Sequence, residues 1–147
     1  MKIEYNNLYT HFVFTTLHRA PLIMEENRPR IEKYITGIVT NNGCHLYAIY
    51  TNPDHVHFLV SRSPDMDEER LACIIEESTT RFINDNKLCN GHFNWQTSCS
   101  AFSVSKGDVD KVCKYILGQK EHHRKHTFAE EYDLFMKHYQ QTIHSKK

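Results

Sequence analysis

Two histidines separated by one residue, His55 and His57, are the side chains most suited to chemistry in this chain. They lie in residues 54–60, whose β-branched and aromatic side chains predict a β-strand. Because side chains alternate between the two faces of a strand, both imidazoles point to one face, about 7 Å apart. Two imidazoles in this arrangement can bind one divalent metal ion. The other interpretation of a bare His-x-His pattern is a pair of surface histidines on a half-buried strand.

A second pattern lies about sixty residues later, where Val109, Val112 and Ile116 recur at helical spacing. Tyr115 and Gln119 are four residues apart in this segment, so they emerge one turn apart on one face of the predicted helix. A phenol oxygen and an amide oxygen would then lie together. Each residue alone has an ordinary interpretation, Tyr115 as a core aromatic and Gln119 as a solvated amide. The paired-histidine strand and this helix together are a much rarer combination.

The composition is that of one compact domain over residues 1–147. A hydrophobic fraction of 39% is enough for a core, and the 18 basic and 18 acidic residues balance, so the net charge indicates no particular partner. Five cysteines, without a Cys-x-x-Cys pair, argue against a zinc knuckle and a disulfide framework and favour reduced thiols in the cytoplasm. No apolar run is long enough to cross a bilayer, so we expect no membrane partner.

The pattern of apolar residues predicts a core at about 5–105, followed by two helices within about 107–140. Strands are expected at residues 9–16, 44–50, 55–61 and 101–104, and helices at 22–41, 68–86, 108–119 and 127–139. The order β-α-β-β-α-β is that of the α+β, ferredoxin-like sandwich, an antiparallel sheet with two helices on one face. The paired histidines would then lie on the open face of this sheet.

Charge is unevenly distributed along the chain. Residues 65–77 carry six acidic side chains against one arginine, whereas residues 106–125 carry six basic against three acidic. Phosphate contacts dominate nucleic-acid affinity, so the acidic segment must face away from any bound nucleic acid. Candidate phosphate contacts lie in and after the helix that carries Tyr115: Lys111, Lys114, Lys120, His122, Arg124 and Lys125. For the cluster after this helix we favour a solvated helix end, where cations offset the carbonyl dipole, over a phosphate contact.

Together these motifs resemble the HUH-class single-tyrosine transposases of small bacterial insertion sequences that move as single-stranded DNA, including the related repeat-associated tyrosine transposases. Pro-Asp-His-Val-His at 53–57 is similar to the family's paired-histidine motif, and Tyr115 with Gln119 is similar to its Tyr-Ile-x-x-Gln helix. Weaker likenesses lie at residues 11–14, Arg19, Pro21, 95–96 and 102–105. The resemblance covers nearly the whole chain.

The resemblance implies a reaction and a role for each motif residue. Tyr115 would attack the scissile phosphate and form a 5′-phosphotyrosine, leaving a free 3′-hydroxyl. His55, His57 and Gln119 would hold a divalent ion, Mg²⁺ or Mn²⁺, that polarises this phosphate. The partner would be single-stranded DNA with hairpins at the element ends. The protein would be a homodimer whose Tyr115 helix works across the interface.

Other functions are compatible with the same residues. A ferredoxin-like sheet with exposed aromatics can stack single-stranded bases without chemistry, and it would then need neither metal nor nucleophile. A domesticated relative would use the same chemistry on chromosomal repeated hairpins and move no element of its own. A structural protein with a histidine-rich surface fits least. The acidic residues 65–77 depart from the family, whose members usually present basic residues there, so the mode of hairpin recognition stays open.

Overall fold

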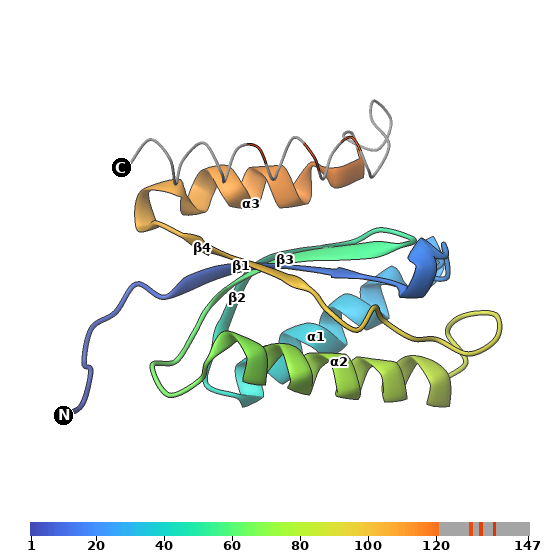
Figure 1. Cartoon of the computed structure of the whole chain (residues 1–147), viewed down its shortest axis with the longest axis horizontal. Coiled ribbons are helices and arrows are strands. Elements are labelled where there is room, and N and C mark those ends of the chain that lie inside the picture. The colour runs from blue at the N-terminus through green and yellow to red at the C-terminus, as the bar shows by residue number, and fades with distance from the viewer. Residues whose placement is uncertain (121–129, 131–132, 134–136, 138–147) are drawn as a thin grey trace. The chain divides into compact units, whose positions relative to one another are not determined.

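The computed structural model describes residues 1–120 and the single positions 130, 133 and 137. Its contacts divide the chain into two compact units, Met1–Leu117 and Gly118–Lys147. The first unit contains all the strands and helices labelled in Figure 1. The helix predicted at 127–139 falls almost entirely outside the described residues, and so do the candidate phosphate contacts His122, Arg124 and Lys125.

Four strands form one antiparallel sheet in the order β2-β3-β1-β4. They are β1 Tyr9–Thr15, β2 His45–Thr51, β3 His55–Ser61 and β4 Ser100–Val104. The central strands β1 and β3 are rich in β-branched and aromatic residues, and nearly all of their side chains are buried. The predicted strands are therefore confirmed to within one residue at each end.

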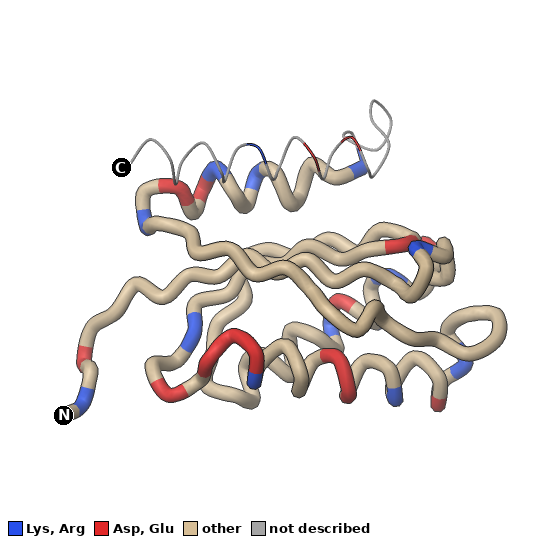
Figure 2. Tube along the Cα trace, in the orientation of Figure 1, with Lys and Arg blue, Asp and Glu red and all other residues tan. Residues whose placement is uncertain are grey.

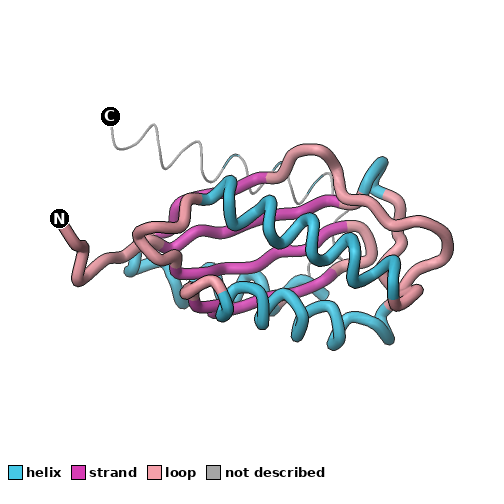
Figure 3. The backbone as a smooth tube through the Cα atoms, turned by 90° about the horizontal axis from the view of Figure 1, so that it is seen from below, coloured by secondary structure: helices cyan, strands magenta, loops and turns pink. Residues whose placement is uncertain are grey.

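Two helices, α1 Arg28–Asn41 and α2 Glu68–Asp85, cover one face of this sheet (Figures 1 and 3). α2 has nearly its predicted range, and a carboxylate oxygen of Asp67 caps it by accepting from the Arg70 backbone N–H at 2.7 Å. α1 begins later than predicted because Pro29 fits the first turn of a helix and not its interior. Sheet order and helix placement confirm the α+β, ferredoxin-like fold.

The main core lies between the sheet and these two helices. Phe12, Phe14 and Phe58 point to this side, and the ring centroid of Phe58 lies 5.2 Å from that of Phe12 and 5.3 Å from that of Phe14. Tyr34 of α1 stacks on Phe82 of α2 with their centroids 4.0 Å apart. Because side chains alternate along β1 and β3, the intervening residues, including the paired histidines, point to the opposite face.

Helix α3, Val109–Leu117, packs on that opposite face (Figure 1). Its fully buried Ile116 joins Ala48, Tyr50 and Leu59 of the sheet in a second apolar cluster. The expectation that this face is open was therefore wrong. Helical periodicity shows that α3 has an apolar stripe, but only the tertiary packing shows that the stripe covers the sheet.

Acidic residues gather at the start of α2 and in the loop before it, whereas both charges occur elsewhere on the first unit (Figure 2). The acidic residues of 65–77 lie on α2 and the loop before it, whereas Lys111 and Lys114 are exposed on α3. The acidic segment thus lies away from the basic helix. Within the described part of the chain, no helix combines the length and apolar character needed to cross a membrane.

Candidate active site

Strand register brings three histidines together on the α3 face of the sheet. In the antiparallel pair β1–β3, Val13 lies opposite His57 and His11 lies opposite Leu59, which makes His11 and His57 diagonal neighbours. His55 shares the face because it precedes His57 by two residues. The ring centroid of His57 lies 5.2 Å from that of His11 and 5.0 Å from that of His55. All three side chains are buried.

A tight turn joins β2 to β3 directly before the paired histidines. The Asn52 backbone N–H donates to the His55 carbonyl at 2.7 Å, with Pro53 and Asp54 at the centre of the turn. The Asp54 carbonyl accepts from the Thr16 backbone N–H at 2.9 Å and from the Thr16 hydroxyl at 3.1 Å. The structure confirms the predicted turn, and these bonds fix it to the end of β1.

The ring of His55 is held by side chains of this turn. Its Nδ1 lies 2.7 Å from Asp54 Oδ1, and its Nε2 lies 3.1 Å from Asn52 Nδ2. A carboxylate only accepts and an amide nitrogen only donates, so neutral His55 carries its proton on Nδ1 and its lone pair on Nε2. A carboxylate behind the other ring nitrogen is typical of metal-binding histidines. Nε2 is therefore the atom of His55 suited to a cation, which would replace the Asn52 amide there.

His57 has a third histidine behind it. Its Nδ1 lies 3.0 Å from Nε2 of His11, which forms a hydrogen bond between two buried rings. Sequence reasoning assigned His11 no role, because one histidine in a strand is not distinctive. Strand alternation was the available signal, since His11 shares a face with the pair once β1 and β3 are aligned in this register.

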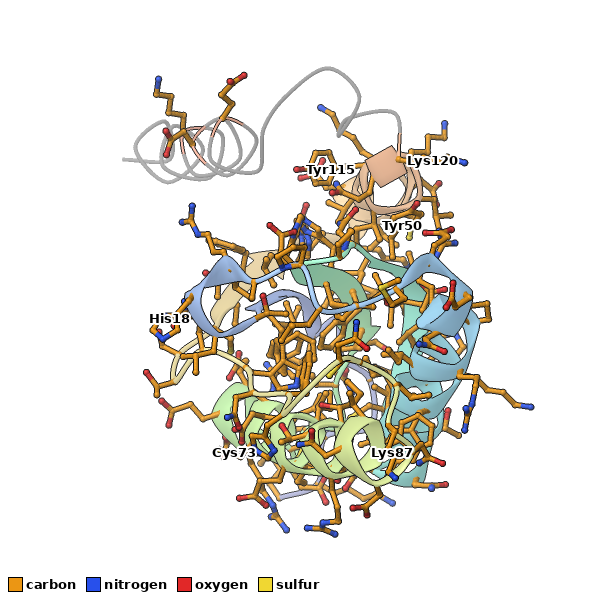
Figure 4. All side chains as sticks on the ribbon, turned by 90° about the vertical axis from the view of Figure 1, so that its right-hand side faces the viewer. His18, Tyr50, Cys73, Lys87, Tyr115 and Lys120 are labelled. Carbon is orange, nitrogen blue, oxygen red and sulfur yellow. The ribbon has the colours of Figure 1, made fainter. Side chains whose placement is uncertain are left out.

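Tyr115 approaches these histidines from α3 of the same chain. Its ring centroid lies 5.7 Å from that of His57 and 6.4 Å from that of His11, and the residue is half-buried (Figure 4). α3 ends at Leu117 and Gly118 forms a turn, so the predicted continuous helix through Gln119 is interrupted there. The first unit brings together Tyr115, His55 and His57, whereas Gln119 belongs to the second unit.

The burial of the paired histidines bears on their suitability for a divalent ion. His55 and His57 are 0% and 2% exposed, so the expectation that they lie on an open face was wrong. An imidazole binds a metal ion through the lone pair of its neutral form. Two adjacent neutral imidazoles fit such an ion as part of its ligand set. Among the described residues, no group of three or more His, Cys, Asp or Glu side chains could hold a metal ion.

A second tyrosine, Tyr50 of β2, lies opposite His57 in the sheet register. The guanidinium carbon of Arg28 lies 4.1 Å from the centre of its ring. Burial raises the pKa of Tyr50 above its usual value, and the Arg28 charge offsets this only in part. Deprotonation of the Tyr50 phenol therefore costs more than that of an ordinary tyrosine, which makes Tyr50 a poor candidate nucleophile.

A cavity of about 680 Å³ lies on the other side of the sheet, beside α2 and residues 95–99. Its lining includes Glu68, Glu69 and Glu76 and contains no lysine or arginine. Carboxylates repel phosphate, so this cavity is poorly suited to a DNA backbone. The paired histidines and Tyr115 lie on the α3 side of the sheet instead.

Comparison with known proteins assigns the chain to a family. Residues 4–119 match the family model described as "Transposase IS200 like", a range that includes the paired histidines, Tyr115 and Gln119. The chain belongs to the IS200-like transposases. This confirms the family that the sequence motifs indicated and makes the protein a transposase, an enzyme that cleaves and rejoins DNA.

Individual relatives of this transposase agree with the assignment. It is similar to the ISDra2 transposase TnpA of Deinococcus radiodurans, with 23% identity over 117 residues, 76% of this chain and 83% of that protein. A crystal structure of a transposase from Deinococcus radiodurans R1 has a TM-score of 0.62 at 21% identity and covers 81% of this chain and 96% of its own. The structure of a REP-associated tyrosine transposase bound to a REP hairpin has a TM-score of 0.61 at 15% identity. The match covers 83% of this chain and 74% of that one. Both structures share the fold.

The candidate phosphate contacts of this transposase are described only in part. Lys111 and Lys114 are exposed on α3, the helix that also carries Tyr115. Lys120 is exposed and belongs to the second unit. Of these candidates, Lys111 and Lys114 lie in the same unit as the paired histidines.

Proposed function

We propose that this transposase cuts and rejoins single-stranded DNA through nucleophilic attack by Tyr115. The observation that supports this most directly is the position of Tyr115 beside His57, with ring centroids 5.7 Å apart. Attack by Tyr115 Oη on phosphorus forms one O–P bond and breaks the bond to the 3′ oxygen. The phenol loses its proton and the 3′ oxygen gains one, which leaves a 5′-phosphotyrosine and a free 3′-hydroxyl.

Rejoining would reverse these bond changes without a further energy source. The phosphotyrosine keeps the energy of the phosphodiester, so the 3′-hydroxyl of another strand can displace Tyr115 and restore its phenol. α3 holds Tyr115 in place for both steps, because the neighbouring Ile116 is fully buried against the sheet.

We propose that His55, His57 and Gln119 hold the divalent ion for this reaction, Mg²⁺ or Mn²⁺. Such an ion supplies a Lewis acid that polarises the scissile phosphate. The two histidines would bind it through imidazole nitrogens, with Asp54 behind His55 fixing the orientation of that ring. Gln119 is included because it matches the Tyr-Ile-x-x-Gln motif. Imidazole ligands favour Mn²⁺ over Mg²⁺.

The formation of a covalent protein–DNA adduct tests this function. The purified transposase is incubated with single-stranded DNA from the regions that flank its gene, with and without Mn²⁺, and analysed by denaturing electrophoresis. We expect a slowly migrating protein–DNA band that requires the metal. DNA binding that needs no metal and yields no covalent band would favour the alternative of a binding module that only stacks bases.

The proposed DNA partner is a single strand with hairpins at the element ends. A structural relative is bound to a REP hairpin, and this chain shares its fold. That likeness also supports a second candidate function, the processing of chromosomal repeated hairpins by a domesticated transposase. The genomic neighbourhood separates the two, since several near-identical gene copies with flanking imperfect hairpins mark a mobile element. Either reaction would take place in the cytoplasm.

Reversing two charges on α3 should weaken DNA binding. In the double variant Lys111→Glu/Lys114→Glu, we expect a higher Kd for single-stranded DNA because two exposed cations beside Tyr115 are replaced by anions. The slope of log Kd against log salt should fall by about 0.7 for each phosphate that the variant no longer neutralises. Fluorescence anisotropy over a salt series measures both. The matched control is Lys33→Glu/Arg81→Glu on α1 and α2, and an equal loss in this control would contradict a specific role for α3.

We propose that the transposase is a homodimer in solution, as the family resemblance implies. The resemblance also implied a Tyr115 helix that works across the interface, whereas here Tyr115 lies beside His57 of its own chain. A partner is therefore not required to bring these two side chains together. Light scattering at micromolar concentration should report twice the chain mass of 17.4 kDa. A monomer at that concentration would contradict the dimer.

A further inference from the structure

The hydrogen bond between His11 and His57 joins a residue without an assigned role to a proposed metal ligand. We propose that His11 is a positioning residue that holds His57 in the tautomer with its proton on Nδ1, which leaves the Nε2 lone pair for a divalent cation. This inference rests on the proposed function of His57. It adds a group that the paired-histidine motif does not contain.

The chemistry of the imidazole limits how this bond can form. Neutral imidazole has a proton on one ring nitrogen and a lone pair on the other. In the contact of 3.0 Å between His11 Nε2 and His57 Nδ1, one nitrogen must donate and the other accept. When His57 donates, its Nε2 can bind a cation. When His57 accepts, its Nε2 carries the proton and cannot bind one.

The neighbouring histidine supports the first of these two arrangements. The Nδ1 of His55 donates to Asp54 at 2.7 Å, and its Nε2 accepts from Asn52 at 3.1 Å. The two histidines of the pair would then be held in the same way, each by an acceptor behind Nδ1. The acceptor behind His57 is a neutral imidazole, which avoids the cost of burying a second carboxylate beside Asp54.

Packing fixes the position of His11 itself. The residue is 0% exposed and lies on β1, between Leu59 on β3 and Phe102 on β4. Its ring centroid lies 6.4 Å from that of Phe102 and 6.4 Å from that of Tyr115. Because neighbours surround the ring, His11 can hold its acceptor nitrogen in one place, as a positioning residue must.

Histidine ¹⁵N NMR on the full chain without metal tests the tautomer directly. Long-range ¹H–¹⁵N spectra distinguish protonated Nδ1 from protonated Nε2, and comparison with His57→Gln identifies the His57 signals. We expect the parent to have the proton of His57 on Nδ1. A proton on Nε2 would overturn the proposal, whether or not the protein binds metal or cleaves DNA.

Substitutions of His11 then connect the tautomer to metal affinity. His11→Leu keeps an apolar side chain of similar size but removes the acceptor, so Mn²⁺ affinity measured by calorimetry should fall 10–100-fold, the usual effect of losing such a partner. His11→Gln places an amide near the position of Nε2 and should restore most of the affinity and the Nδ1 proton. The matched packing control is Leu59→Ala, opposite His11 in the register.

Three outcomes would overturn the proposal: unchanged affinity in His11→Leu, failure of His11→Gln to restore the Nδ1 proton, or an equal loss in Leu59→Ala. The last outcome would show that His11 acts only through packing. A parent that binds no Mn²⁺ would contradict the proposed metal site, whereas the NMR tautomer of the parent decides the role of His11 separately.

Discussion

Replacing Tyr115 with phenylalanine is expected to abolish strand cleavage and leave the binding of single-stranded DNA nearly unchanged. The substitution removes only the Oη atom, which is the proposed nucleophile, and keeps the ring that packs beside His57 and His11. A phenyl ring has no atom that can form the bond to phosphorus, so the loss should be complete. Denaturing electrophoresis measures the covalent band in the presence of Mn²⁺, and fluorescence anisotropy measures binding.

The control for this variant is Tyr47→Phe, which removes a hydroxyl from a tyrosine of β2 that is 42% exposed. It should cleave like the parent. If Tyr115→Phe still forms a covalent adduct, another tyrosine is the nucleophile. Tyr132 and Tyr139, which lie outside the described residues, would be the first to examine.

His55→Ala and His57→Ala are each expected to abolish cleavage. One imidazole and an amide oxygen make a poor site for a hard ion that already binds water well. Gln119→Ala should have a smaller effect, because water can replace a neutral amide ligand. The measurement is the same covalent-adduct assay, run over a series of Mn²⁺ concentrations.

The structure changes the expected effect of these substitutions on stability. Two histidines on an open sheet face would cost about half a kcal/mol when replaced, as surface residues do. Here both histidines are buried. Replacing His55 removes a hydrogen bond of Asp54 and one of Asn52, and replacing His57 removes a hydrogen bond of His11. We therefore expect each alanine variant to lose about 1–3 kcal/mol of unfolding free energy.

Thermal unfolding with and without Mn²⁺ separates structural from metal-binding effects. The parent should gain stability with Mn²⁺, and both alanine variants should lose that gain, because a ligand stabilises only the state that binds it. His92→Ala, an exposed histidine in a loop, is the control and should keep the gain. A variant that is folded at the assay temperature and still cleaves would place the metal site elsewhere. A variant that keeps the full Mn²⁺ gain would do the same.

Local sequence patterns determined most of the fold and the position of the paired histidines within it. Alternation of side chains placed His55 and His57 on one face of a strand that the structure has at the predicted residues. Turn-forming residues at 51–54 predicted the hairpin, and helical periodicity predicted α2 to within one residue. These features depend on residues close in sequence, which is why they could be predicted.

Tertiary structure alone decided what surrounds the paired histidines. Tyr115 of α3 covers His57 from a helix that follows it by about fifty residues and packs on a face that local patterns left open. The contact of His11 with His57 depends on the register between β1 and β3, and the position of Tyr115 beside His57 depends on how α3 packs. Periodicity determines which side of an element is apolar, but the packing of distant elements determines what covers that side.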